Sequence, residues 1–408
     1  MRPNQSIFVF APLIALSLAA QADLLDEVNK ALWIHDSDNR FSVQLTGLLD
    51  FEGYYIDQRP PGTIDSENEF LFNPRLRLFL DAQITTHLYF CAQVRVDRGF
   101  DPSDDGAQIR LDEYFVRYTP VDERISFEIG KFATVIGNWV PRHDSWLNPF
   151  INAPLPYENI TTLSDSEAPS SRRDFAGRRF QTTEQYERIP LVWGPNYTTG
   201  AVVLGTVDKF DYAFEIKNAA ISSRPDSWQP TETGWDNPTY SGRMAYRPNE
   251  SWNLGFSGSI GPYMTNTAET RETLPLGKSI DNYNEYLLGQ DASYAWRHLQ
   301  IFAEIFEARF EVPTVGDADT LSYYIESRYK ITPQLFAAGR WNQQLYATVP
   351  TGGWGPQPWG NDIWRVDAAL GYRFTNYLQV KIQYSFSHQD AAVQQGEQLV
   401  AGQLTIKF

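Results

Sequence analysis

The 408-residue sequence has a single cysteine, an excess of acidic over basic residues and, beyond its first two dozen residues, no long apolar run. Because Cys91 has no second cysteine to pair with, an internal disulfide framework is excluded. With a formal net charge of -16, we expect no nucleic-acid partner. After residue 22 no segment is long and apolar enough to span a bilayer as a helix. A soluble secreted protein or a β-barrel therefore remains.

The first 22 residues have the three parts of a secretory signal peptide. Arg2 supplies the positive start, residues 7–20 form the apolar core, and Ala20-Gln21-Ala22 has the small-residue pattern of a cleavage site. We therefore expect export by general secretion and a mature chain that begins at Asp23.

The rest of the sequence alternates between apolar and polar residues. At the end of the chain Leu404, Ile406 and Phe408 share one face, and Thr405 and Lys407 share the other. The same alternation recurs in residues 364–374, 378–387 and many earlier segments. A strict period of two predicts β-strands with one apolar and one polar face.

The connections between these strands alternate between short turns and long loops. Seven polar turns lie near residues 85–87, 120–124, 207–209, 248–251, 296–298, 331–333 and 375–376. Eight longer connections span residues 57–68, 98–107, 133–197, 218–237, 261–283, 311–319, 346–361 and 389–398. Short turns on one side and long loops on the other are typical of an outer-membrane barrel. The count predicts an all-β fold, a sixteen-stranded antiparallel transmembrane β-barrel with both termini in the periplasm.

A soluble β-sandwich or propeller would also alternate. Two features favour the barrel instead. Aromatic residues gather near strand ends, where membrane interfaces would lie, at Trp252, Tyr294, Trp296, Tyr329, Tyr372, Phe374 and Tyr377. The polar face also carries full charges, which a sandwich core would not accept unpaired. We therefore divide the chain into a signal peptide (1–22), a short periplasmic segment (23–39) and a transmembrane barrel (40–408).

The third long connection, residues 133–197, is named loop 3 here and is far longer than the others. A barrel of this size has a wide lumen, so something must narrow it. The loop is rich in aromatic residues and prolines, which argues against disorder. We expect loop 3 to fold inward and form the constriction. Its basic residues, with Lys131 just before it, become candidate anion-binding groups: Arg142, Arg172, Arg173, Arg178 and Arg179. The alternative, local pairing with acidic residues of the same loop, stays open.

Alternation also assigns charged residues to the lumen. The basic set is Arg75, Arg77, Arg95, Arg117, Arg243, Arg328, Arg340, Arg365, Arg373 and Lys381. Inward-pointing acids include Asp81, Asp97, Glu128, Asp211, Glu215, Asp291, Glu304, Glu326 and Asp367. Confined charges of both signs tend to pair. Opposed rows across a lumen make a transverse field that filters polar solutes.

The segment FEIGKFATVIGNW, followed by the long loop, resembles the phosphate-selective porin O and P family of Gram-negative outer membranes. The matching residues are Gly130, Lys131, Phe132 and Gly137, and the general layout extends over nearly the whole mature chain. The terminal Leu404, Ile406 and Phe408 are similar to the signal read by the barrel-assembly machinery. The resemblance implies a homotrimer, periplasmic termini and anion uptake.

These patterns predict passive diffusion of small polar or anionic solutes, phosphate among the candidates. We expect no catalytic residue, cofactor or metal. The acidic stretch 97–106 lacks regular calcium-loop spacing and is interpreted as an outer loop that is solvated or bridges lipopolysaccharide through divalent ions.

A carbohydrate-selective porin is the main alternative, because sugars stack on aromatic faces. The aromatic residues that suggest it are Trp228, Trp235, Trp354 and Trp359. A barrel enzyme is a second alternative, for which His388 is the one histidine in a suitable place.

Overall fold

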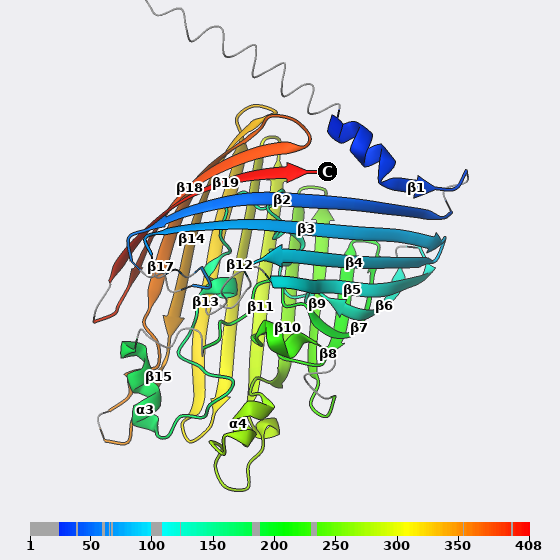
Figure 1. The fold of residues 1–408 in the computed structure, drawn as a ribbon. Helices are drawn as coiled ribbons and strands as arrows, with labels where there is room; N and C mark the ends of the chain where they lie inside the picture. Colours follow the sequence, from blue (N-terminus) through cyan, green and yellow to red (C-terminus); the bar gives the residue numbers. More distant parts are fainter. Residues whose placement is uncertain are drawn as a thin grey trace, which may run out of the picture.

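The computed structural model describes residues 24–408 except 38–39, 59–61, 65, 67, 99–107, 123, 182–187, 230–234, 354 and 393–394. The expected signal peptide therefore lies outside the described residues, as does most of the acidic stretch 97–106. In the described part, antiparallel strands form one large sheet that curls into a barrel (Figure 1).

Sixteen strands make the closed wall, which confirms the predicted fold. They are β2 (Ser42–Ile56), β3 (Phe70–Thr85), β4 (Leu88–Asp97), β5 (Gln108–Val121), β6 (Ile125–Phe132), β7 (Thr198–Val207), β8 (Phe210–Lys217), β9 (Thr239–Asn249), β10 (Trp252–Pro262), β11 (Asn284–Trp296), β12 (Leu299–Val312), β13 (Gly316–Lys330), β14 (Leu335–Tyr346), β17 (Ile363–Arg373), β18 (Leu378–Gln389) and β19 (Gly396–Lys407). Each pairs with the next, and β19 pairs with β2 from Leu399↔Ile56 to Lys407↔Leu48. Closure leaves no long exposed sheet edge.

The turns lie where alternation predicts them, but one long connection differs. Residues 311–319 were expected to form a loop, whereas β12 continues to Val312 and β13 begins at Gly316. The turn between them contains Thr314, which has a positive φ of 64°. The strand ends on either side of this turn carry Glu311, Asp317 and Asp319, which is why the segment looks like a loop in the sequence. In the structure Glu311 lies opposite Asp317 in the register of the two strands.

Both described ends of the chain lie at the turn end of the barrel. A helix over residues 24–31 leads into β1 (Trp33–His35), which pairs with Ser42–Gln44 of β2. The backbone of Phe408 forms two hydrogen bonds with that of Gly47, which also lies on β2. In Figure 1 the helix and the C-terminus lie at one end, opposite α3 and α4.

The outer wall of the barrel is apolar, as a membrane-spanning barrel requires. Large apolar side chains are exposed along it, among them Phe72, Val116, Ile129, Phe214, Phe256, Leu288, Ile325, Leu370 and Ile382. Aromatic residues near the turn end are also exposed, including Trp252, Trp296, Tyr329, Tyr372 and Phe374. No helix among the described residues is long and apolar enough to cross a membrane.

Short elements connect the strands at the loop end and inside the barrel. They are η1 (Val140–Arg142), α2 (Leu155–Glu158), α3 (Arg172–Gly177), η2 (Arg178–Phe180), η4 (Pro225–Trp228), α4 (Asn266–Thr270), η5 (Ile280–Asn282), β15 (Thr348–Val349) and β16 (Gln357–Pro358). The first four belong to loop 3, which joins β6 to β7.

The largest apolar core lies inside the barrel rather than outside it. Aromatic residues of loop 3, such as Trp193 and Phe175, pack with inward residues of the barrel wall, such as Phe306 and Phe310. The expected assignment of polar residues to the inner face is therefore wrong for the loop-end half of β12. There the charged residues, such as Arg309, point outward, because the inner face must accommodate the apolar loop.

Candidate pore constriction

Loop 3 crosses the interior and binds to several strands of the wall. Its beginning contacts β8, where Thr134 Oγ1 donates to Glu215 Oε1 at 2.7 Å. It then reaches β10, where the Gly137 amide donates to Ser257 Oγ at 3.2 Å. Gly137 has a φ of 72°, and a Cβ there would meet Tyr157 and Glu304 at less than 3 Å. Only glycine fits this close approach of the loop to the wall.

Glu304 of β12 is the central anchor of the loop. Its Oε1 accepts the backbone amides of Asn138 and Trp139, the second at 2.8 Å. Its Oε2 accepts the Tyr157 hydroxyl at 2.6 Å. One buried carboxylate thus satisfies donors from two separate parts of loop 3, which holds the loop in one position.

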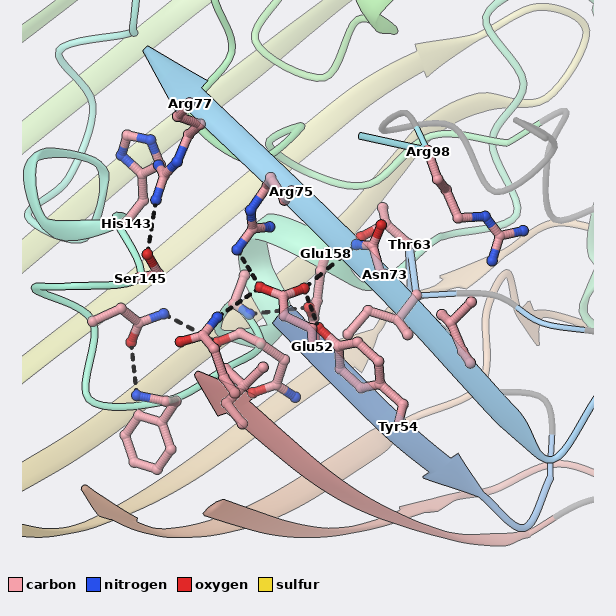
Figure 2. Close-up of a pocket in the computed structure, with 18 of the residues that line it drawn as sticks. Glu52, Tyr54, Thr63, Asn73, Arg75, Arg77, Arg98, His143, Ser145 and Glu158 are labelled. Atoms are coloured by element: carbon pink, nitrogen blue, oxygen red, sulfur yellow. Dashed lines mark hydrogen bonds and ion pairs between the residues drawn. The ribbon is translucent and has the colours of Figure 1, made fainter. Parts of the chain in front are cut away.

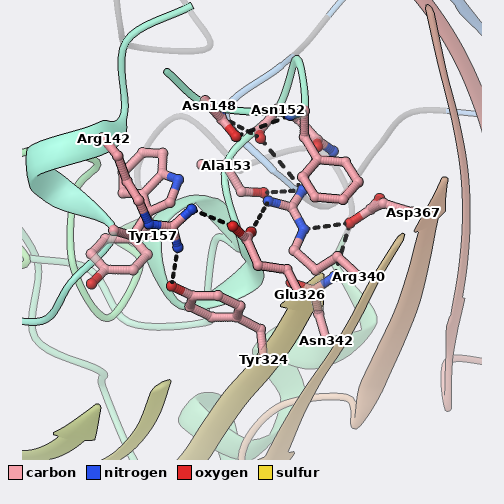
Figure 3. A network of polar contacts seen from close by, with 12 residues as sticks. Arg142, Asn148, Asn152, Ala153, Tyr157, Tyr324, Glu326, Arg340, Asn342 and Asp367 are labelled. Atoms are coloured by element: carbon pink, nitrogen blue, oxygen red, sulfur yellow. Dashed lines mark hydrogen bonds and ion pairs between the residues drawn. The ribbon is translucent and has the colours of Figure 1, made fainter. Parts of the chain in front are cut away.

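Arg340 and Arg142 continue this polar contact between loop and wall, as Figure 3 shows. Arg142 of the loop pairs with Glu326 of β13. Arg340 of β14 lies 2.8 Å from Asp367 and donates to Asn152 Oδ1 at 2.6 Å. Both arginines are largely buried, so the contacts fix loop 3 rather than face an open channel.

Lys381 and Arg365 hold residues 145–158 of the loop. The Lys381 ammonium donates to the carbonyls of Ser145, Asn148 and Phe150, each at 2.9 Å. Arg365 pairs with Glu158 of α2 and binds a loop carbonyl. The predicted lumen-facing residues Arg340, Arg365 and Lys381 do point inward, but loop 3 covers them.

A polar cavity of about 160 Å³ remains between loop 3 and the wall made by β2, β3, β4 and β19. In Figure 2, Arg75 points toward Glu52 and lies near Glu158, while Arg77 and Arg98 lie on either side of this group. Its wall also includes aromatic and amide groups, namely Tyr54, Asn73, Trp139, His143, Asn148, Phe150, Asn152 and Gln403. Side chains of both charge signs therefore line this narrow space.

The arginines of this wall are paired with neighbouring acids. Arg75 contacts Glu52 and lies 3.3 Å from Asp50, while Arg77 contacts Asp144 of loop 3. Three further predicted lumen arginines also form ion pairs. The pairs are Arg95–Asp97, Arg117–Glu128 at 2.6 Å and Arg243–Asp291 at 2.7 Å. The structure therefore brings both charge signs together as ion pairs rather than as a free cationic ladder.

His143 and Asp144 form the edge of loop 3 beside this cavity. Burial lowers the pKa of His143, so the ring is neutral at pH 7 and is hydrogen-bonded to Val140 O and to the Tyr197 hydroxyl. Burial, the largest single effect, would raise the pKa of Asp144, but the combined attraction of its neighbours, Arg77 first among them, holds that pKa below its ordinary value. Asp144 is therefore charged and tied to Arg77.

Arg328 and Arg373 differ from the other predicted lumen residues. Both lie at the turn end of the barrel, and neither forms an ion pair with an acid of the described chain. Arg328 stacks on Phe336 at 4.3 Å, and Arg373 stacks on Trp146 of loop 3 at 4.8 Å.

The arginine-rich segment of loop 3 lies at the loop end of the barrel, beyond the cavity (Figure 1). Arg172 donates to Thr314 O at 3.3 Å, and Arg179 donates to Gln357 Oε1 at 3.2 Å. Arg178 lies 3.7 Å from Asp174, the local pairing considered above. Arg173 is exposed on α3. These four residues lie together on one short helical segment at the loop end, while Arg142 alone of the loop set lies deep in the lumen.

Lys131 lies inside the wall and donates to Leu111 O at 2.8 Å. The preceding Gly130 has a φ of 146°, and a Cβ there would meet Tyr114 O at 2.2 Å. This glycine lets β5 and β6 approach closely. The residues behind the family resemblance thus have a local structural role.

The aromatic residues that suggested a sugar channel are mostly buried. Trp228 and Trp359 are 1% and 0% exposed and pack inside the core, so neither presents a face to a sugar. Trp235 is exposed, and Trp354 lies outside the described residues. His388 lies 3.8 Å from Asp390, and in the described part of the chain no serine hydroxyl bonds its ring.

The sequence predicts the strands of the barrel wall, but not the contacts by which wall residues hold loop 3. Glu304 and Lys381 were both assigned to the inner face, but most of their partners are backbone groups of loop 3, which carry no sequence signal. The glycine at 137, between an apolar run and a tryptophan, was the one local indication of a tight approach.

No family model matches this sequence, and no curated protein matches it. Among solved structures, the anion-selective porin from Comamonas acidovorans has a TM-score of 0.56 at 10% identity, covering 90% of this chain and 100% of that one. Salmonella typhi OmpF, in complex with daunomycin, has a TM-score of 0.55 at 12% identity, covering 92% and 100%. The outer-membrane channel DcaP of Acinetobacter baumannii has a TM-score of 0.53 at 8% identity, covering 92% and 99%. This chain therefore has the barrel fold of sixteen-stranded outer-membrane porins.

Proposed function

We propose that the protein is an outer-membrane channel for passive diffusion of small polar or anionic solutes, without catalytic activity. The observation that carries the proposal is the polar cavity beside loop 3, lined by arginines and carboxylates from β2, β3, β4 and the loop. Small charged or polar solutes can exchange hydrogen bonds with such a wall, whereas apolar solutes cannot replace the hydrogen bonds that polar side chains make with water.

The location and partners follow from the same reasoning. An apolar outer wall with aromatic ends suits a bilayer, and an exported barrel of this kind belongs in the outer membrane, in contact with lipids and lipopolysaccharide. We propose a homotrimer because one structural neighbour, OmpT of Vibrio cholerae, is described in a trimer form. We also propose that the strand ending in Phe408 is the segment read by the barrel-assembly machinery.

The selectivity is proposed to be mildly anionic. The outer mouth carries Arg172, Arg173, Arg178 and Arg179, and a positive rim raises the local concentration of anions. Phosphate is one candidate solute. Ion pairing within the lumen argues for a general filter rather than a strict phosphate channel.

The test is planar-bilayer conductance of the purified protein, with the reversal potential measured across a KCl gradient. Wild type should conduct with a mild anion preference, and glutamine at the four rim arginines should shift the reversal potential toward cations. Arg309→Gln is the matched control, because this arginine faces outward from the barrel. Absence of conductance would refute the channel proposal, and an unchanged reversal potential would refute the role of the rim. Block by maltodextrins but not by phosphate would favour the carbohydrate alternative.

A further inference from the structure

Two arginines of the inner vestibule lack the acidic partners that the other lumen arginines have. Arg328 is the third-last residue of β13, and Arg373 is the last residue of β17. Within the described chain, no carboxylate lies within ion-pair distance of either guanidinium. Among the described residues, Arg373 is the neighbouring charge that acts on Arg328, so the electrostatic interaction there is repulsive.

The two side chains face the same part of the lumen. The intervening strand β14 places Phe336 between them, and the Phe336 ring covers Gly371, two residues before Arg373. Arg328 stacks on one side of this region, at 4.3 Å from the Phe336 ring centre. Both arginines are half-buried, so they are partly desolvated but still reach the vestibule.

Loop 3 completes the surface from above. Arg373 donates to Trp146 O at 2.7 Å and to Gln379 Oε1 at 2.8 Å, which fixes the plane of its guanidinium. The Trp146 ring lies 4.8 Å from Arg373 and 5.8 Å from Lys407, the last residue of β19. Three cations and two aromatic rings therefore gather on the inner side of the constriction.

A buried or half-buried cation without a counter-charge is costly, and an anion from solution removes that cost. The planar fork of arginine fits carboxylate and phosphate oxygens with paired hydrogen bonds. Stacking on an aromatic ring leaves the edge of the Arg328 guanidinium available to donate. In Arg373, Nε and Nη2 already donate to Gln379 and Trp146, so Nη1 is the nitrogen that remains for a ligand. The ligand must be a small solute rather than a lipid headgroup, because these side chains face the lumen.

We propose that Arg328 and Arg373, with Trp146 and Lys407, form an anion-binding site at the periplasmic end of the channel that takes carboxylate or phosphate groups of the permeating solute. The site deepens the proposed function, since it names the chemistry on which passage would depend. Its occupancy can be measured without any current through the pore.

The experiment is titration calorimetry of the folded protein in detergent at low ionic strength, where screening is weak. Succinate and inorganic phosphate are the two probes, and they distinguish a carboxylate site from a phosphate site. We expect saturable binding of at least one of them to wild type. Arg328→Gln with Arg373→Gln should weaken that binding about tenfold or more, because hydrogen bonds to charged groups are lost. Arg328→Lys, which keeps the charge, should lose less.

Arg117→Gln is the matched control, since Arg117 also lies in the lumen near the turn end but already pairs with Glu128. It should bind like wild type. The proposal is overturned if wild type binds neither probe, if the double variant binds as tightly as wild type, or if Arg117→Gln weakens binding equally. Unchanged heat-modifiable migration on a gel verifies folding of each variant. A protein that binds the anion but does not conduct would contradict the channel function and leave the site established.

Discussion

Replacing Glu304 with alanine should release loop 3 from the wall of the barrel. The carboxylate accepts two backbone amides and the Tyr157 hydroxyl. Three hydrogen bonds to this buried carboxyl group contribute up to about 1.5 kcal/mol each. Removing a buried carboxylate also removes the cost of its desolvation, so we expect the docked state of the loop to lose about 3 kcal/mol.

Hydrogen exchange of the anchored amides measures this loss directly. Asn138 and Trp139 exchange when the loop opens, so a loss of about 3 kcal/mol should accelerate exchange in peptides of this segment about a hundredfold. Conductance should also become larger and noisier, because the constriction is no longer fixed.

Glu307→Ala on the same strand is the control, since Glu307 is exposed on the opposite face. Glu304→Gln keeps the shape of the side chain but only one of its two acceptor oxygens. It should give an intermediate rate, and it serves if the alanine variant does not assemble. Equal exchange in Glu304→Ala and wild type, or equal acceleration in Glu307→Ala, would refute the anchoring role.

Three further predictions follow from the wall, the interior and the outer loops. Ile382 faces outward, so Ile382→Arg should destabilise the inserted barrel by about 2–4 kcal/mol and impair assembly, as measured by heat-modifiable migration. Ile382→Ala should assemble. Normal assembly of Ile382→Arg would contradict the lipid-facing assignment. Cys91 faces inward but packs against Phe115, Phe132 and Val202, so a small thiol reagent should label it slowly. Phe132→Ala should accelerate the labelling. Rapid labelling of wild type would count against this packing. Burial raises the pKa of Asp165 to about 6, so the folded state favours its protonated form, and packing of the outer loops around it should weaken as pH rises from about 4 through 6. Asp165→Asn should flatten the pH dependence of hydrogen exchange in residues 160–168. An unaltered profile would refute the assignment.

Sequence patterns sufficed for the wall because a barrel strand is specified locally. Residues such as Val366 and Asp367 alternate in the chain as they do in space, and turn residues separate one strand from the next. The loop-end half of β12 broke the pattern: Phe306 and Phe310 face inward there because the partner of that face is apolar loop 3, not water. Alternation alone would also make Gln383 a tolerant lumen position, yet its side chain accepts the Ile151 amide at 2.6 Å and is buried.

The interior could not be derived in the same way, because its contacts join residues far apart in the chain. Lys381 was expected to line an open pore, but the carbonyls of Ser145, Asn148 and Phe150 take its three hydrogens. The alternation pattern marks both as inward cations, so it does not distinguish a lysine that binds loop carbonyls from an arginine that binds solute. Whether an inward charge fixes the loop or serves the solute depends on what the loop places beside it. On this physical basis the paired residues maintain the constriction, and Arg328 and Arg373, for which the described fold supplies no counter-charge, remain for the solute.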